Sequence, residues 1–154
     1  MHASTVLAAL AAIVSPALAD FYLYAGTQSS TIDGTTLDSF VPFTGPPDCN
    51  DVFNGPILTP SSDVSGNKRG VRCKGCSSAY GSEDMVKVTE LEMNHADYGH
   101  WTFYADRGGD MVDLDGNLVG NCVVDGSDGY TCTDGMAGYS GRSQLRCTTG
   151  LIIP

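Results

Sequence analysis

The chain has 154 residues, and its 18 Asp and Glu against eight Lys and Arg give a formal net charge of −10. Such an acidic chain repels phosphate backbones and anionic lipid head groups, which argues against nucleic acids and membranes as partners. Nineteen glycines and seven prolines argue against long helices.

The first nineteen residues, MHASTVLAALAAIVSPALA, contain no Asp, Glu, Lys or Arg. An apolar run, residues 6–14, precedes a proline and the sequence Ala17-Leu18-Ala19, which is typical of a secretory signal peptide and its cleavage site. The run is shorter than the roughly 20 apolar residues that span a bilayer. We therefore expect residues 1–19 to be a signal peptide and residues 20–154 to be one secreted, extracellular domain.

Short segments rich in β-branched and aromatic residues follow, separated by Asp-Gly and other turn signals. They are residues 21–26, 37–43, 69–75, 86–94, 100–106, 111–115, 117–122, 129–133 and 143–149. This spacing predicts an all-β fold, a single-domain antiparallel β-sandwich or barrel braced by disulfides. Residues 45–66, with four prolines, are expected to form a long connection, and the helix candidate is a capped turn at residues 82–85.

Two of these segments carry a readable alternation. In residues 100–106, Trp101 and Phe103 should face one side of the sheet. In residues 86–94, the apolar parity shifts between Val88 and Leu91, which predicts a β-bulge.

Residues 111–120 read as a hairpin about Asp115-Gly116, with Val112 and Leu114 turned toward the core. Asp113, Asp115 and Asn117 alternate as in calcium-binding loops. However, the glycine is not at the sixth position that an EF-hand requires, so we interpret these residues as turn formers. We predict no metal site and no cofactor.

Six cysteines lie after the predicted cleavage site: Cys49, Cys73, Cys76, Cys122, Cys132 and Cys147. In an oxidising compartment they predict up to three disulfides, with 15 possible pairings. Cys73 and Cys76 have no second close pair to complete a zinc site, and no βαβ context supports a thioredoxin-like role. We expect both to bond to different distant partners; a bridge between the two would need special local geometry, and a redox role is a further alternative.

Acid–base groups are most abundant in residues 90–110, and Gly-x-Ser-x-Gly, the nucleophile elbow, is absent. Glu90 and Glu92 share one face of a strand, and with His95 or His100 and an arginine they could form the base, acid and phosphate clamp of a ribonuclease-like hydrolase. The sequence does not fix which strand carries the facing histidine. We assign no catalytic residue and keep this hydrolase as an alternative.

Two segments are candidates for binding a partner. Lys68, Arg69 and Arg72 belong to a basic segment that is either a solvated loop or a patch that docks an acidic partner. Residues 95–101 would form a recognition tip through Tyr98, His100 and Trp101 if that loop is exposed, although a lone tryptophan more often lies in the core.

Several blocks of the sequence carry a resemblance: PDCNDVFN, DVSGNKRGVRCKGC, LEMN, HWTFYADRGGDMVDLDGN and RCTTG. From Asp48 to Gly150 the chain resembles small secreted cysteine-rich proteins of filamentous ascomycete fungi, which are mostly of unassigned activity and include candidate effectors. The resemblance implies a non-enzymatic partner of a host extracellular protein, most concretely an inhibitor of a secreted papain-like cysteine protease that suppresses immunity in the host apoplast. A wall-associated structural protein is a further alternative.

Overall fold

The structure is a computed structural model that describes residues 19–77 and 85–151, with side chains from residue 21 onward. The predicted signal peptide lies outside the described residues except for Ala19, and the predicted helical turn at 82–85 does so except for Met85. The elements are β1 (Ala19–Ser30), β2 (Thr36–Phe43), α1 (Cys49–Asn54), β3 (Gly70–Lys74), β4 (Glu90–His95), β5 (Gly99–Tyr104), η2 (Ala105–Arg107), β6 (Asp110–Asp113), β7 (Leu118–Val124), β8 (Gly129–Asp134) and β9 (Ala137–Thr149).

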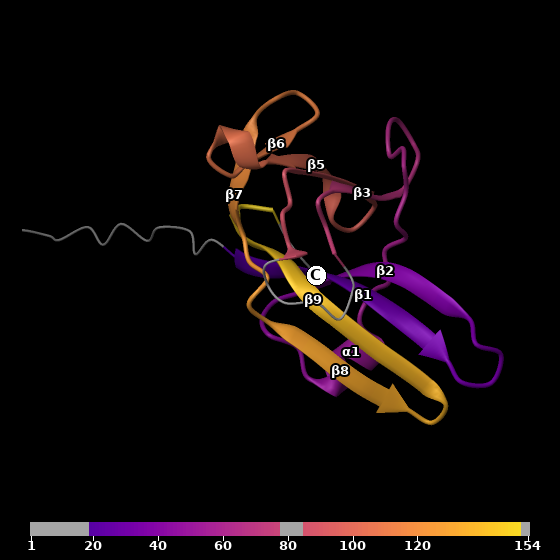
Figure 1. Ribbon diagram of the computed structural model, residues 1–154. Helices are drawn as coiled ribbons and strands as arrows, with labels where there is room; N and C mark the ends of the chain where they lie inside the picture. The colour runs from indigo at the N-terminus through magenta and orange to yellow at the C-terminus, as the bar shows by residue number, and fades with distance from the viewer. Residues whose placement is uncertain (1–18, 78–84, 152–154) are drawn as a thin grey trace, which may run out of the picture.

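Antiparallel pairing joins all these strands into one sheet, which confirms the predicted all-β fold. Its order is β2-β1-β9-β7-β6-β5-β4-β3, and β8 pairs with the first half of β9 while β7 pairs with the second half. The sheet curls into a nearly closed barrel, and β1, β2, β8 and β9 extend from it as a long arm (Figure 1). Each predicted strand coincides with one of these nine, although β1 and β9 are longer than expected.

The gap between the two edge strands is bridged by the long connection. Phe40 on β2 and Leu58 exchange two backbone hydrogen bonds of 2.9 Å. On the other side, Val71 of β3 donates to the carbonyl of Thr59 at 3.0 Å and accepts from the amide of Ser61 at 2.9 Å. Residues 58–61 therefore satisfy backbone groups that edge strands would otherwise leave open.

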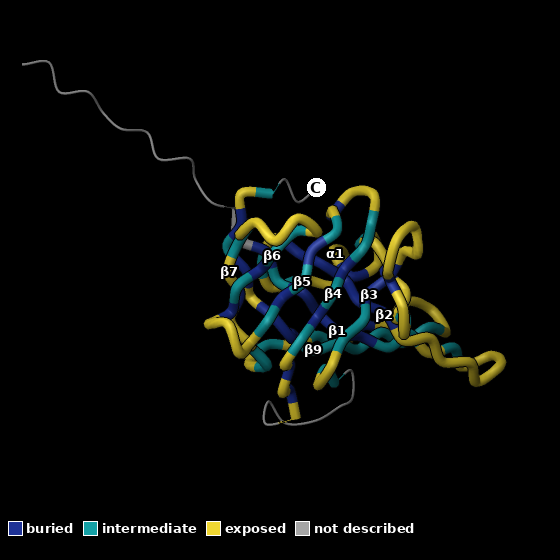
Figure 2. The backbone as a smooth tube through the Cα atoms, turned by 90° about the horizontal axis from the view of Figure 1, so that it is seen from above, coloured by how far each residue is buried: buried dark blue, intermediate teal, exposed yellow. Residues whose placement is uncertain are grey.

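Two apolar cores follow from the alternation of the strands. Inside the barrel, Leu23, Leu91, Trp101, Met111 and Leu145 are essentially inaccessible to solvent. Buried positions gather in the middle of the barrel, and exposed ones follow the loops and the arm (Figure 2). A second cluster lies on the opposite face of β1 and β2 and includes Tyr24, Val41, Phe43, Val52 of α1 and Cys132 of β8.

The helix α1 was not predicted within the long connection. The Asp48 side chain accepts a hydrogen bond from the amide of Asp51, and the Asp51 side chain accepts one from the amide of Asp48, each at 3.0 Å. This capping box can be recognised in the sequence, but the prolines on either side of it led to the prediction of a connection without a helix. The disulfide Cys49–Cys132 then fixes the helix to β8.

Two paired glycines lie under an aromatic ring in the long arm. Gly26 on β1 and Gly141 on β9 are paired in register, and the ring of Tyr130 from β8 covers them. A Cβ atom at Gly26 would lie 2.5 Å from the Tyr130 hydroxyl, and one at Gly141 would lie 2.4 Å from the ring. The glycines therefore make room for an aromatic side chain across the sheet.

Three local predictions are corrected. Met111, not Val112 or Leu114, faces the core, because Met111 pairs in register with the inward Phe103, and Leu114 in the loop is 71% exposed. The Asp115-Gly116 hairpin turn itself is confirmed between β6 and β7. The predicted bulge after Val88 is also wrong, because β4 begins only at Glu90 and the preceding residues are irregular.

The third correction concerns the cysteines. Cys73 and Cys76 bond to each other rather than to distant partners, and the remaining bridges are Cys49–Cys132 and Cys122–Cys147. The chain leaves β3 through Gly75, whose φ of +87° lies in the left-handed region, so the two Cα atoms come within 5.9 Å.

Candidate functional site

The structure brings together the acid–base groups of the hydrolase prediction. In β3, β4 and β5 every second side chain points away from the core, which places Arg72, Glu90, Glu92 and His100 on one outer face. Nε2 of His100 lies 3.0 Å from Glu92 Oε1, and Arg72 Nη2 donates to Glu92 Oε2 at 2.8 Å and to Glu90 Oε1 at 2.6 Å. We call these four residues the Glu–His–Arg cluster, and β5 carries the facing histidine.

Charge compensation dominates this cluster. Hydrogen bonds from Lys74 and Arg72 lower the pKa of Glu90 against the opposing effect of burial. Burial alone would raise the pKa of Glu92, but hydrogen bonds from His100 and Arg72 outweigh it and lower the pKa. Both carboxylates are therefore ionised and paired at neutral pH, which makes Glu92 a weak proton acceptor.

The other histidine does not join the cluster. His95 ends β4, where its Nδ1 lies 3.6 Å from Asp97 and its ring contacts that of Tyr98 at 5.3 Å between centroids. Arg107, the arginine within residues 90–110, does not join the cluster either. It stacks on Tyr104, with the guanidinium carbon 4.0 Å from the ring centroid. Of the two histidines in the predicted hydrolase, only His100 thus contacts a glutamate.

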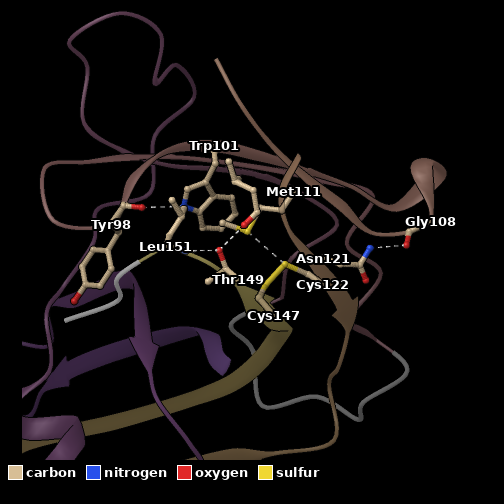
Figure 3. Close-up of a disulfide and its surroundings, with 10 residues drawn as sticks. Tyr98, Trp101, Gly108, Met111, Asn121, Cys122, Cys147, Thr149 and Leu151 are labelled. Carbon is tan, nitrogen blue, oxygen red and sulfur yellow. Dashed lines mark hydrogen bonds between the residues drawn. A yellow bond between two sulfur atoms is a disulfide. The ribbon is translucent and has the colours of Figure 1, made fainter. Parts of the chain in front are cut away.

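The loop of the predicted recognition tip at residues 95–101 is exposed in part, but the aromatic side chains Tyr98 and Trp101 are buried. Trp101 is 1% exposed and Tyr98 6%, and the indole Nε1 donates to the Tyr98 carbonyl at 3.0 Å. Figure 3 shows Trp101 beside Met111 and near the Cys122–Cys147 disulfide, within the barrel core. The burial of Tyr98 and Trp101 shows that the predicted tip is wrong, since a side chain inside the core cannot contact a partner.

The basic segment does not form a continuous positive patch. Lys68 pairs with Asp63 in an exposed loop, and Arg72 belongs to the Glu–His–Arg cluster. Arg69 is exposed and lies with His95 and Ile57 beside a small cavity of ≈150 Å³. The positive charges of Lys68 and Arg72 are thus largely compensated by neighbouring carboxylates.

A surface that the sequence did not suggest lies at the end of the arm. Ile32, in the loop between β1 and β2, is 74% exposed, and Met136, in the turn between β8 and β9, is 61% exposed. The two loops are joined because the amide and hydroxyl of Thr31 both donate to the Met136 carbonyl at 2.9 Å. Leu37, at the start of β2, is 54% exposed. We call Ile32, Leu37 and Met136 the hairpin-tip surface.

Local turn chemistry fixes this surface in place. Asp33 accepts hydrogen bonds from the amide and hydroxyl of Thr35 at 3.1 and 2.8 Å, and Gly34 has φ +69°. These bonds lower the pKa of Asp33 and keep it ionised beside the apolar residues. No sequence signal singles it out, because an apolar residue beside an Asp-Gly turn, as at Ile32 and Met136, also occurs at Leu114 and Val124.

The aspartates of the calcium-like sequence act as turn formers. Asp113 accepts hydrogen bonds from the amides of Asp115 and Asn117 at 2.9 and 2.8 Å. Its other oxygen accepts one from the Asn117 side chain at 2.9 Å. Across residues 19–77 and 85–151, no group of three His, Cys, Asp or Glu side chains is arranged to hold a metal ion.

The comparisons with known proteins found no match. No family model matches the chain, and no curated protein or solved structure matches it significantly. Within the part of the chain that the structure describes, no helix is long and apolar enough to cross a membrane. All six cysteines are paired, which is typical of proteins that mature in an oxidising or extracellular environment.

Proposed function

We propose that the protein is a secreted, non-enzymatic binding protein that contacts an extracellular protein of the host through its hairpin-tip surface. The observation that carries this proposal is the pair of exposed side chains, Ile32 and Met136, held in two loops that hydrogen-bond to each other. Isolated exposed apolar residues are common on protein surfaces, but these lie together on a protruding end that is ordered before binding.

Preorganisation favours this surface for insertion into a cleft. The tip ends the β1–β2 and β8–β9 hairpins, which are joined by the pairing of β1 with β9, and a disulfide ties α1 to β8 within the same arm. Little conformational freedom is lost when such a tip is bound, so more of the contact energy contributes to affinity. The most concrete partner is a secreted papain-like cysteine protease, whose cleft would accept the apolar side chains.

The test compares inhibition by matched variants. The oxidised protein, residues 20–154, is titrated into a papain-like protease with a fluorogenic peptide substrate. Ile32→Glu and Met136→Glu should each weaken inhibition by at least tenfold, because a charge would be buried in the interface. Leu114→Glu, at a 71% exposed position in the β6–β7 loop, is the control and should leave inhibition unchanged. Inhibition that survives both tip substitutions would refute this surface, and a wild-type protein that inhibits no protease would refute the protease as partner.

A second candidate function is the ribonuclease-like hydrolase, which the 3.0 Å contact between His100 and Glu92 favours. Arg72 would hold the phosphate and His100 would protonate the leaving group, while Glu92 would accept the proton from the nucleophile, a role that its lowered pKa disfavours. His100→Ala and Glu92→Gln should then each lower the rate of RNA cleavage by at least a hundredfold. Lack of RNA cleavage by the wild-type protein, or equal rates in wild type and variants, would exclude this site.

A further inference from the structure

The Cys73–Cys76 disulfide differs from the two other bridges in its surroundings. The others join residues 83 and 25 positions apart, and three of their four cysteines are buried. Cys73 and Cys76 are only three positions apart, and both are partly exposed. A bridge that closes so short a ring restricts the unfolded chain least, and accessible bridges exchange more readily than buried ones.

The turn that contains this bridge is held by other bonds as well. The carbonyl of Lys74 accepts from the amide of Thr89 at 2.9 Å, and that of Gly75 accepts from the amide of Lys87 at 3.0 Å. Immediately after the bridge, Ser77 exchanges two hydrogen bonds with the fully buried Gln144 side chain, at 3.0 and 2.8 Å.

These bonds do not depend on the sulfur–sulfur bond. Breaking the bridge would therefore leave the backbone of Cys73 and Cys76 in place, with the two thiols still adjacent. Thiols held in this way re-form their disulfide in an intramolecular step, which is far more efficient than a reaction between separate molecules. The bridge can thus cycle between two redox states while the barrel stays folded.

A cavity gives access to the bridge. It has a volume of ≈370 Å³ and lies at the seam of the barrel, between Ser39 and Phe40 of β2 and Cys73 of β3. Cys76 and the exposed Ser62 also line it. This volume falls within the range of about 300–1,000 Å³ that is typical of small-molecule sites.

We propose that Cys73–Cys76 is a thiol–disulfide exchange site that reacts with low-molecular-weight thiols entering through this cavity. The incoming thiolate attacks Sγ of one cysteine, a new disulfide forms between them, and the Cys73–Cys76 bond breaks. The other Sγ leaves as a thiolate and takes a proton from water. A second thiolate then attacks the mixed disulfide and releases the oxidised small molecule, so that two thiols supply the two electrons that reduce the bridge.

The first experiment measures which bridge reacts. The folded protein is equilibrated in glutathione buffers of increasing reduced-to-oxidised ratio, quenched with acid, alkylated and analysed by peptide mass spectrometry and circular dichroism. Cys73 and Cys76 should be alkylated together, while the other four cysteines stay oxidised and the β-sheet spectrum is retained. Reduction of another bridge at the same or a lower ratio, or loss of the spectrum together with reduction of Cys73–Cys76, would overturn the proposal.

The second experiment follows the intermediate and its route. With oxidised glutathione, Cys76→Ser or Cys73→Ser should trap a glutathione adduct on the remaining cysteine, and the absence of an adduct on both would overturn the exchange step. Ser62→Trp should slow reduction of the wild-type bridge at least tenfold by filling the cavity. Thr133→Trp, at an exposed position on β8, is the matched control and should not slow it. Equal rates in both variants would overturn the entry route.

Discussion

Removing each disulfide in turn should destabilise the barrel to very different extents. In the chain-entropy model, a bridge stabilises by restricting the unfolded chain over the loop that it closes. Separations of 83, 25 and 3 residues correspond to about 4.6, 3.5 and 1.6 kcal/mol for Cys49–Cys132, Cys122–Cys147 and Cys73–Cys76. Entropy alone therefore ranks the bridge between α1 and β8 first.

Packing removes the difference between the two long-range bridges. Cys122 and Cys147 are 2% and 0% exposed, so alanine at both positions leaves two small voids that cost about 1 kcal/mol each, by analogy with a deleted methylene. Cys49 is exposed, but Cys132 is 4% exposed, so replacing this pair leaves one such void and adds about 1 kcal/mol. We expect losses of about 5.5 kcal/mol for the Cys122→Ala/Cys147→Ala variant and about 5.6 kcal/mol for the Cys49→Ala/Cys132→Ala variant, which are equal within the precision of the reasoning.

The free energy of unfolding can be measured by urea titration of the oxidised double-alanine variants, with Trp101 fluorescence as the signal. Since domains are stable by only about 5–15 kcal/mol, the variants that lack a long-range bridge should be marginally folded or unfolded. Cys73→Ala/Cys76→Ala should stay folded. Equal losses for all three variants, or the smallest loss for the buried pair, would refute the reasoning.

Three further predictions concern the core and the titrating groups. Trp101→Ala should cost about 3–5 kcal/mol in a urea titration followed by circular dichroism, because the residue fills the barrel interior, and a loss below about 1 kcal/mol would contradict its placement. Stability should fall as the pH drops below about 4.3, the usual pKa of glutamate, because Glu90 and Glu92 have lowered pKa values in the folded protein and must be protonated there. Glu92→Gln should make the fall of stability with decreasing pH less steep, and an unchanged dependence on pH would count against the ion pairs. Burial raises the pKa of Tyr130 to about 12, and burial together with the hydrogen bond to Asp128 raises the pKa of Tyr24. Ultraviolet titration should therefore show late-ionising tyrosines, and stability should be lost as the pH rises above 10. A Tyr130→Phe variant with an undiminished late phase and the same alkaline loss would contradict the assignment.

Alternation along the strands made the barrel predictable. Trp101 and Phe103 occupy every second position of β5, so the pattern predicts that both face the same side of the sheet, and the structure shows that this is the inner side. A residue on the inner face of a strand cannot also be presented to a partner, which rules out a recognition tip at Trp101. The general preference for aromatics at interfaces therefore does not apply to this residue.

What could not be predicted depends on pairing between distant segments. The second half of β1 and the first half of β9 are rich in glycine and serine, which have low strand propensity, and they form strands because they pair with each other. The Glu–His–Arg cluster likewise required the neighbours of β4 to be known. Since β3, β4 and β5 follow one another as a simple meander, that order was the most probable one, and it would have placed Arg72 and His100 on either side of Glu92.

The long connection shows why turn-rich sequence should not be treated as a passive linker. Residues 58–61 hydrogen-bond to both edge strands, and Pro60, which has no amide hydrogen, limits further strand pairing at this position. The connection therefore keeps the barrel from extending its sheet into another molecule. It closes the seam only in part, because the cavity beside Ser62 and the Cys73–Cys76 bridge remains open to entry. A segment that read as loop thus determines both where the sheet ends and where a small molecule can approach it.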